Sequence, residues 1–158
     1  MKMTSIVSAV VLSLVSSFSA YAAPPSTETN VGATPMETSY PAETIEGKWW
    51  TEGKEGLMKI QKTKSGRYEV IIISAKDEAK NDEKNPNPKL RDRKLKGIVI
   101  MWNLKFEDGE YVDGYCYNPR DGNTYRVNMK ITGPNTLRIR GYLLVPLLGQ
   151  SQDWARQV

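Results

Sequence analysis

One group of carboxylates and one turn that contains Asp121 are the parts of this sequence whose spacing could support chemistry. Glu107, Asp108, Glu110 and Asp113 lie close together, and a pair of carboxylates can act as acid and base in hydrolysis. Asp121, beside a glycine and asparagines, vaguely resembles an oxygen-rich calcium loop. The first group straddles a predicted hairpin turn, and the second lacks the acidic spacing of a calcium loop, so turn formation accounts for both. We therefore expect neither a catalytic pair nor a metal site here.

The other residue types that commonly carry catalysis are nearly absent. The chain of 158 residues contains no histidine and a single cysteine, Cys116. Without histidine a Ser-His or Cys-His pair cannot exist, and zinc would have one thiolate and carboxylates alone. A lone cysteine in a strand is most often a small buried hydrophobic residue, with a reactive thiol or an intermolecular disulfide as the alternatives. The sequence predicts a protein that is not an enzyme and holds no cofactor.

The strongest functional signal is apolar. In segments 96–106 and 123–131 every second residue is apolar, so each segment has one continuous apolar face. If these faces enclose a cavity, it would suit a small hydrophobic or lipid-like ligand. The side chains that we expect to line this cavity are Trp102, Leu104, Tyr125, Val127 and Tyr142.

The alternative is a domain with a filled core that binds through its outer surface. Tyr111, Tyr115 and Tyr117 lie on one predicted strand beside basic residues, and they could contact an envelope protein, a lipid headgroup or a glycan. The formal net charge is +4. The basic residues mostly occupy polar alternation positions, which is typical of a solvated face rather than of a nucleic-acid site. We expect no nucleic-acid partner.

Residues near the two ends of the chain indicate how the domain is closed. Gly47 lies two residues before Trp49, and Trp154 and Arg156 lie near the C-terminus. In a closed sheet these ends become neighbours, and an arginine guanidinium can then stack on an indole ring. Arg140 is the other candidate for this stack. The five residues either close the sheet or line a ligand pocket.

The elements that would position these residues are short strands separated by glycine turns. Closing the sheet removes the exposed edges that invite aggregation. The sequence therefore predicts an all-β fold, an eight-stranded antiparallel up-and-down barrel, with a two-sheet sandwich as the runner-up. The expected strands are 45–50, 56–62, 67–75, 96–106, 110–117, 123–131, 136–144 and 151–157. The charged segment 76–94 is either a solvated loop or a lid over one end of the barrel.

The N-terminal residues predict export. Residues 1–22 contain Lys2, an apolar stretch diluted by serines and a small-residue cleavage site at Ala20–Ala22, which is the pattern of a cleavable signal peptide. The stretch is too short to serve as a membrane span. Residues 23–43 are rich in Pro, Ser, Thr and Glu and are expected to form a disordered linker. We therefore expect a barrel domain at 44–158, in the periplasm or secreted, with no transmembrane segment after cleavage.

Several motifs together resemble an exported bacterial family, the domain of unknown function DUF2147. The resemblance spans essentially residues 45–158 and is most specific near the C-terminus. It implies a small barrel like those of the lipocalin and calycin group, and it implies no established activity. The chain departs from the family pattern in lacking cysteines before Gly97. The motifs are Gly47 with Trp49; Leu95, Gly97 and Trp102; Asn118, Gly122 and Tyr125; Arg140-Gly141-Tyr142; and Pro146, Gly149, Ser151, Gln152, Trp154 and Arg156.

Overall fold

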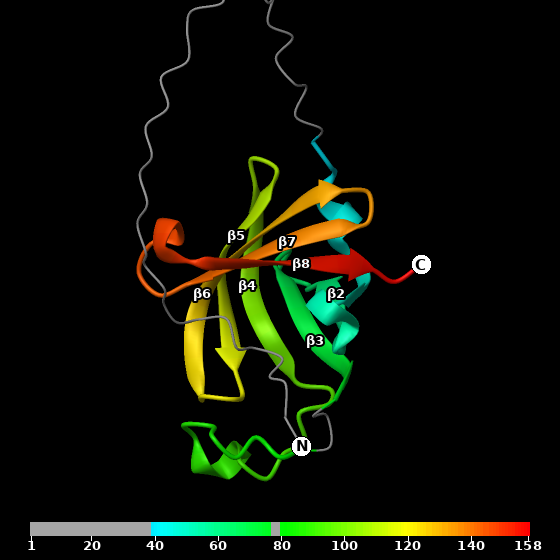
Figure 1. Ribbon diagram of the computed structural model, residues 1–158. Coiled ribbons are helices and arrows are strands. Elements are labelled where there is room, and N and C mark those ends of the chain that lie inside the picture. Colours follow the sequence, from blue (N-terminus) through cyan, green and yellow to red (C-terminus); the bar gives the residue numbers. More distant parts are fainter. Residues whose placement is uncertain (1–38, 77–79) are drawn as a thin grey trace, which may run out of the picture.

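The computed structural model describes residues 39–76 and 80–158. Within these residues eight antiparallel strands form a closed barrel in which each strand pairs with the next and β8 pairs back to β1 (Figure 1). The predicted up-and-down barrel is confirmed, and the sandwich is excluded. The expected signal peptide at 1–22 and most of the expected linker at 23–43 lie outside the described residues.

The strands follow the expected ranges closely. The largest difference is in β4, which begins at Val99 rather than at residue 96. Four short 3₁₀ helices accompany the strands in the described parts of the chain. The elements are η1 (Ala42–Ile45), β1 (Gly47–Trp50), η2 (Glu52–Lys54), β2 (Gly56–Lys62), β3 (Tyr68–Ala75), η3 (Pro88–Leu90), β4 (Val99–Glu107), β5 (Glu110–Asn118), β6 (Asn123–Gly133), β7 (Thr136–Tyr142), η4 (Pro146–Leu148) and β8 (Gln150–Arg156).

The alternating strand directions divide the connections between two ends of the barrel. Helix η1 and the tight β2–β3, β4–β5 and β6–β7 hairpins lie at one end, which we call the η1 end. The connections 51–55, 76–98, 119–122 and 143–149 lie at the other end, which we call the mouth. In Figure 1 the β4–β5 hairpin is at the top and the long β3–β4 connection is at the bottom.

Large side chains fill the interior towards the η1 end. Trp49, Tyr68 and Leu104 have exposures of 0–1%, so no water-sized space touches them from inside or outside. Gly114 faces this core, where an added Cβ would lie 2.5 Å from the Leu104 side chain. Tyr111 is equally buried, and its hydroxyl donates to the carbonyl of η1 residue Ala42 at 2.6 Å. Helix η1 therefore closes this end of the barrel.

The chain joins this core before the expected domain boundary at residue 44. Tyr40 and Ala42, which the sequence assigns to the linker, are partly buried and pack against the core cluster. Ile45, the last residue of η1, has 0% exposure. The segment just before β1 is thus part of the packed unit, because its apolar side chains complete the η1 end.

Register shifts interrupt several strand pairs, and one in β4 and one in β5 move side chains that the sequence assigned to a functional face. Val70 pairs with Met101 and Tyr68 pairs with Leu104, so β4 holds one extra residue between these pairs. Asn103 absorbs it with a left-handed φ of 64°. As a result Trp102, expected to face inward, is on the outer face with 37% exposure. That part of the predicted alternation is wrong.

The shift in β5 lies between Tyr111 and Gly114. Tyr111 pairs with Met129 and Gly114 pairs with Val127, and Asp113 between them has a φ of 59°. The bulge places Tyr111 inside the barrel, whereas Tyr115 faces outward beside Trp102. The tyrosines of this strand therefore do not share one surface, contrary to the sequence expectation.

Candidate functional site

The barrel is sealed at the η1 end by Arg156. Its guanidinium lies 4.1 Å from the ring centroid of Trp49 and donates to the carbonyls of Thr44 and, at 3.2 Å, of Glu46. The Trp49 indole in turn donates to Ile45 at 2.8 Å. Gly47 has a φ of +127°, and a Cβ there would lie 3.4 Å from the guanidinium. Glycine thus permits both the backbone conformation and the close approach of the arginine.

Arg140 and Trp154, the other two residues expected at the closure, have different positions. Trp154 is 3% exposed in the core, and its indole donates to Gln152. Arg140 is on the outside and donates to the carbonyls of Pro146 at 2.5 Å and Leu147 at 3.1 Å. Arg140 therefore supports the β7–β8 connection and does not take part in the seal.

The five residues expected to line a ligand do not form one pocket. Leu104 and Val127 lie in the filled part of the interior. Tyr125 is nearer the mouth, where its hydroxyl donates to Asp121 at 2.7 Å. Trp102 and Tyr142 are on the outer face, and the Tyr142 hydroxyl donates to Asn128. The expected lining is therefore divided between the core, the mouth and the outside.

Part of the apolar interior stays accessible at the mouth. Four partly buried side chains pack against the core cluster from this end: Ala75, Leu95, Ile98 and Cys116. Burial, followed by the nearby Asp121 carboxylate, raises the pKa of the Cys116 thiol to about 12. The thiol is therefore neutral at pH 7, as expected of a small hydrophobic residue rather than of a nucleophile. We call these four side chains the rim. Their accessible apolar surface is suited to shallow contact with an apolar group.

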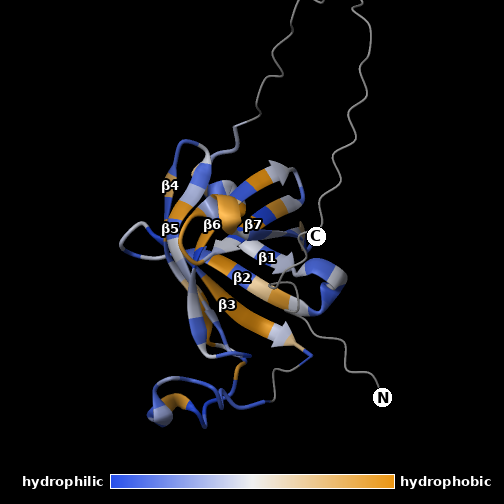
Figure 2. Ribbon diagram, turned by 60° about the vertical axis from the view of Figure 1, so that its left-hand side comes forward, coloured by the Kyte–Doolittle hydropathy of each residue, from blue (hydrophilic) through white to orange (hydrophobic). Residues whose placement is uncertain are grey.

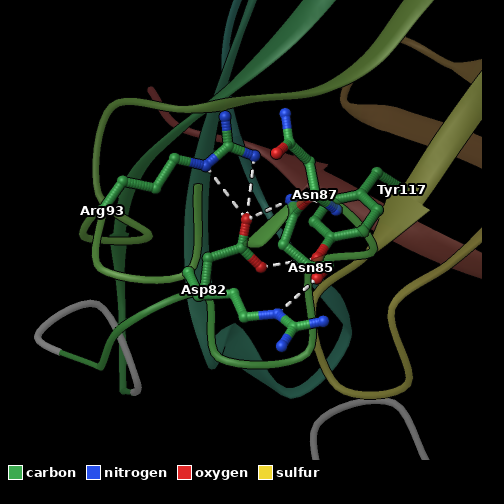
Figure 3. A network of polar contacts seen from close by, with 6 residues as sticks. Asp82, Asn85, Asn87, Arg93 and Tyr117 are labelled. Carbon is green, nitrogen blue, oxygen red and sulfur yellow. Dashed lines mark hydrogen bonds and ion pairs between the residues drawn. The ribbon is translucent and has the colours of Figure 1, made fainter. Parts of the chain in front are cut away.

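A buried polar cluster, which we call the clasp, holds the β3–β4 connection over this mouth. The Asp82 side chain has 0% exposure and receives Nε and Nη2 of Arg93 at 2.9 and 2.8 Å. It also accepts from the Asn85 amide at 2.7 Å and the Tyr117 hydroxyl at 2.5 Å (Figure 3). Tyr117 belongs to β5, so the clasp ties the connection to the strand that follows β4 in the barrel.

The adjacent β5–β6 turn fits tightly against the clasp. Gly122 has a φ of +76°, and an added Cβ would lie 2.1 Å from the Lys84 carbonyl oxygen. Asp121 in the same turn accepts from Tyr125, from Asn118 and from the backbone of Asn123. The suggested calcium loop is thus a hydrogen-bonded turn. In the described parts of the chain no group of three or more His, Cys, Asp or Glu residues could hold a metal ion.

The acidic residues near the β4–β5 hairpin form surface ion pairs. Glu107 pairs with Lys105 at 3.0 Å, Glu110 with Lys130 at 3.4 Å, and Asp113 with Arg126 at 3.3 Å. These carboxylates lie on the outer surface, each beside its own cation. They do not face one another across a cleft, which an acid and base pair would require.

The clasp should make the protein sensitive to alkali. Burial, and then the hydrogen bond to Asp82, raise the pKa of Tyr117 from 10.0 to about 12. The unfolded chain therefore loses this proton first, so the stabilisation is complete below pH 10 and disappears as the pH rises towards 12. We expect deprotonation of Tyr117 to lower the free energy of unfolding by about 2 kcal/mol, measured by urea denaturation at a series of pH values.

The loss of stability at high pH should be smaller in Tyr117→Phe, whereas Tyr115→Phe should follow the parent. An identical pH profile for parent and Tyr117→Phe would contradict it.

The β7–β8 connection exposes a run of apolar residues (Figure 2). Leu144 and Leu147 are each 85% exposed, and Leu148 is 78% exposed. The sequence contained this signal, because residues 143–148 are all apolar and include a proline. Strand β7 was expected to reach residue 144 but ends at Tyr142, so the leucines leave the sheet and face water.

A row of aromatic and arginine side chains crosses the outer face next to this connection. Trp102, Tyr115, Arg126 and Tyr142 occupy paired positions on β4, β5, β6 and β7. Trp102 stacks on Tyr115 with ring centroids 5.9 Å apart, and the Arg126 guanidinium lies 4.8 Å from the Tyr115 centroid. The row ends one residue before the exposed leucines.

Comparison with known proteins places this barrel among bacterial proteins. The model of the family described as "Uncharacterized protein conserved in bacteria (DUF2147)" matches residues 47–156. Protein HP1028 from the human pathogen Helicobacter pylori, described as belonging to the lipocalin family, is 32% identical with a TM-score of 0.60. That match covers 65% of this chain and 73% of that chain. None of the curated proteins matches. No helix within the described residues is both long and apolar enough to cross a membrane.

Proposed function

The chain belongs to the DUF2147 family and has a lipocalin-like barrel, and from this premise we propose that it is an exported binding protein for a small apolar or lipid-like ligand. The ligand would enter at the mouth and contact the rim around Cys116. This is a binding role rather than an enzymatic one. It assigns the protein to the periplasm or the cell exterior.

The observation that carries this proposal is the distribution of accessible apolar surface inside the barrel. Leu104 and Val127 are sealed, at 0% and 1% exposure, whereas Ile98 and Cys116 pack on the core and keep accessible surface. Apolar surface that a ligand removes from water contributes roughly 25 cal/mol per Å². The bound group would therefore be shallow, and a bulky headgroup would stay outside the barrel.

Cys116 offers a direct test of ligand binding because it is the single cysteine. We expect oleate to slow the labelling of Cys116 by a thiol reagent about tenfold when oleate is at about ten times its Kd. Labelling is measured near pH 9, since the raised pKa of the thiol slows the reaction at neutral pH. Native mass spectrometry should show the corresponding gain in mass.

Two neighbouring residues supply the matched control for this test. Ile98→Asn places an amide on the rim and should weaken protection by oleate, whereas Val99→Asn changes a side chain with 38% exposure and should not. If oleate changes neither labelling nor mass in the parent protein, binding of an apolar ligand at the mouth is wrong.

Two features of the outer surface favour the surface-binding alternative. Tyr111 is in the core and Tyr117 is in the clasp, so they cannot form the expected tyrosine surface. The exposed leucine connection and the aromatic row are nevertheless unusual for a surface in contact with water alone. They indicate a second, separate contact.

A further inference from the structure

The leucines of the β7–β8 connection are held outward by a fixed backbone. Arg140 donates to the carbonyls of Pro146 and Leu147 and to the hydroxyl of Ser151. Gly149 is packed so closely that a Cβ would lie 2.5 Å from the Gly141 carbonyl oxygen. The leucines therefore project from a braced turn and do not collapse onto the barrel. Contiguous exposed apolar side chains of this kind mark a contact site.

The other large connection at the mouth is basic. Residues 80–96 contain seven Lys or Arg residues and three Asp or Glu residues, which gives a formal charge of +4. Asp82 is buried against Arg93, and because these two charges neutralise each other, the other Lys, Arg, Asp and Glu residues carry the net +4. A surface of this charge favours an anionic partner.

The aromatic row has the composition of side chains at a membrane interface. Trp and Tyr side chains concentrate at the boundary between headgroups and acyl chains, because their rings are apolar and their tips are polar. Tyr142 immediately precedes Leu143, and Trp102 and Tyr115 continue the row away from the connection. Neighbouring strands are about 4.8 Å apart, so the row extends for about 14 Å.

We propose that the mouth docks on a bilayer containing anionic phospholipid, with the leucines of the β7–β8 connection inserted at the acyl boundary. The basic β3–β4 connection then faces the headgroups, and the Trp102–Tyr142 row lies at the interface. The six-residue apolar run 143–148 inserts readily to a depth of about 5–10 Å. It offers much less than the roughly 800 Å² per partner of a stable protein interface. This contact goes beyond ligand binding and does not depend on it.

Vesicle flotation tests the proposal with residues 23–158, the form that export with signal-peptide cleavage would leave. We expect the protein to float with vesicles of phosphatidylglycerol and phosphatidylcholine in equal parts. Leu144→Ser with Leu147→Ser should weaken this binding about a hundredfold, because two largely exposed leucines lose their insertion. Lys84→Glu with Lys89→Glu should weaken it at least about tenfold. All variants share one N-terminal segment, so the differences report on the mouth.

Matched changes at the η1 end distinguish docking through the mouth from nonspecific binding to vesicles. Val158→Ser removes an exposed apolar side chain there, and Lys59→Glu with Lys64→Glu reverses two exposed charges. Both should float like the parent. Equal flotation of the leucine variant and the parent would overturn insertion, and equal flotation with phosphatidylcholine alone would overturn the anionic requirement. The oleate assay contains no vesicles, so failure of either proposal is recognised separately.

Discussion

Replacing Arg156 with alanine is expected to lower the free energy of unfolding by about 3 kcal/mol. The side chain stacks on Trp49 at 4.1 Å, and a partly desolvated cation–π contact contributes about 1–2 kcal/mol. It also donates to the carbonyls of Thr44 and Glu46, and hydrogen bonds from a charged group contribute about 1.5–3 kcal/mol. These terms share one side chain and do not add fully. Urea denaturation measures the loss.

Two further variants identify the origin of this effect. Arg156→Lys keeps the charge but has no planar fork to stack on an indole while reaching two carbonyls, so most of the loss should persist. Arg138→Ala removes an exposed pair with Asp153 at 2.9 Å and should cost at most about 1 kcal/mol. If Arg156→Ala costs no more than Arg138→Ala, the seal does not stabilise the barrel.

The strands could be predicted because their signals are local. In β6 the apolar residues Val127, Met129 and Ile131 are buried, and Arg126 and Lys130 between them are more exposed. Two-residue alternation and glycine turns depend only on neighbours in the sequence. The order of the strands followed from the same signals, because an up-and-down sheet pairs each strand with the next. Closure then removes the two remaining edges.

The bulges could not be predicted in the same way. Asn103 and Asp113 have positive φ values of 64° and 59° within strands, where a non-glycine residue rarely adopts this conformation. One extra residue reverses every side chain beyond it. This error placed Trp102 inside the expected pocket, and it made Tyr111 and Tyr115 look like neighbours on one face.

The seal and the clasp are long-range contacts that differ in how much of them the sequence reveals. Gly47, Trp49 and Arg156 were expected near one another because a closed barrel joins its ends, and the structure places them in contact. Arg140 was an equal candidate in sequence but faces outward from its register position on β7. Only the three-dimensional pairing distinguishes the two arginines.

The clasp had no comparable signal. Asp82 lies in a run of charged residues that predicted a solvated loop or a lid, and nothing local distinguishes it from Glu83 or Asp92. Its burial depends on Tyr117, which is 35 residues away in the sequence. Composition records how many charges a loop has, but it does not record which of them folds against the barrel.

Replacing Asp82 with asparagine should release the β3–β4 connection from the mouth and leave the barrel folded. The substitution keeps the shape of the side chain but leaves Arg93 without its carboxylate partner. It also replaces one carboxylate oxygen with an amide nitrogen, which cannot accept the hydrogen bonds that Asn85 and Tyr117 donate to Asp82. Breaking a buried ion pair from one side costs about 3–5 kcal/mol. The connection can open separately from the barrel, so the cost should appear there. We expect hydrogen exchange of the Asp82 and Leu95 amides, which bond across the connection, to quicken about a hundredfold.

The opposing charge shows whether this effect arises from the ion pair. Adding Arg93→Gln to Asp82→Asn removes the unpaired cation, so exchange should slow again towards the parent rate. Asp153→Asn breaks an exposed pair with Arg138 and should leave exchange in the connection unchanged. If Asp82→Asn leaves those amides as protected as in the parent, the clasp does not hold the connection. If the barrel strands exchange faster to the same degree, the connection and the barrel unfold as one unit, and a mouth that opens independently is excluded.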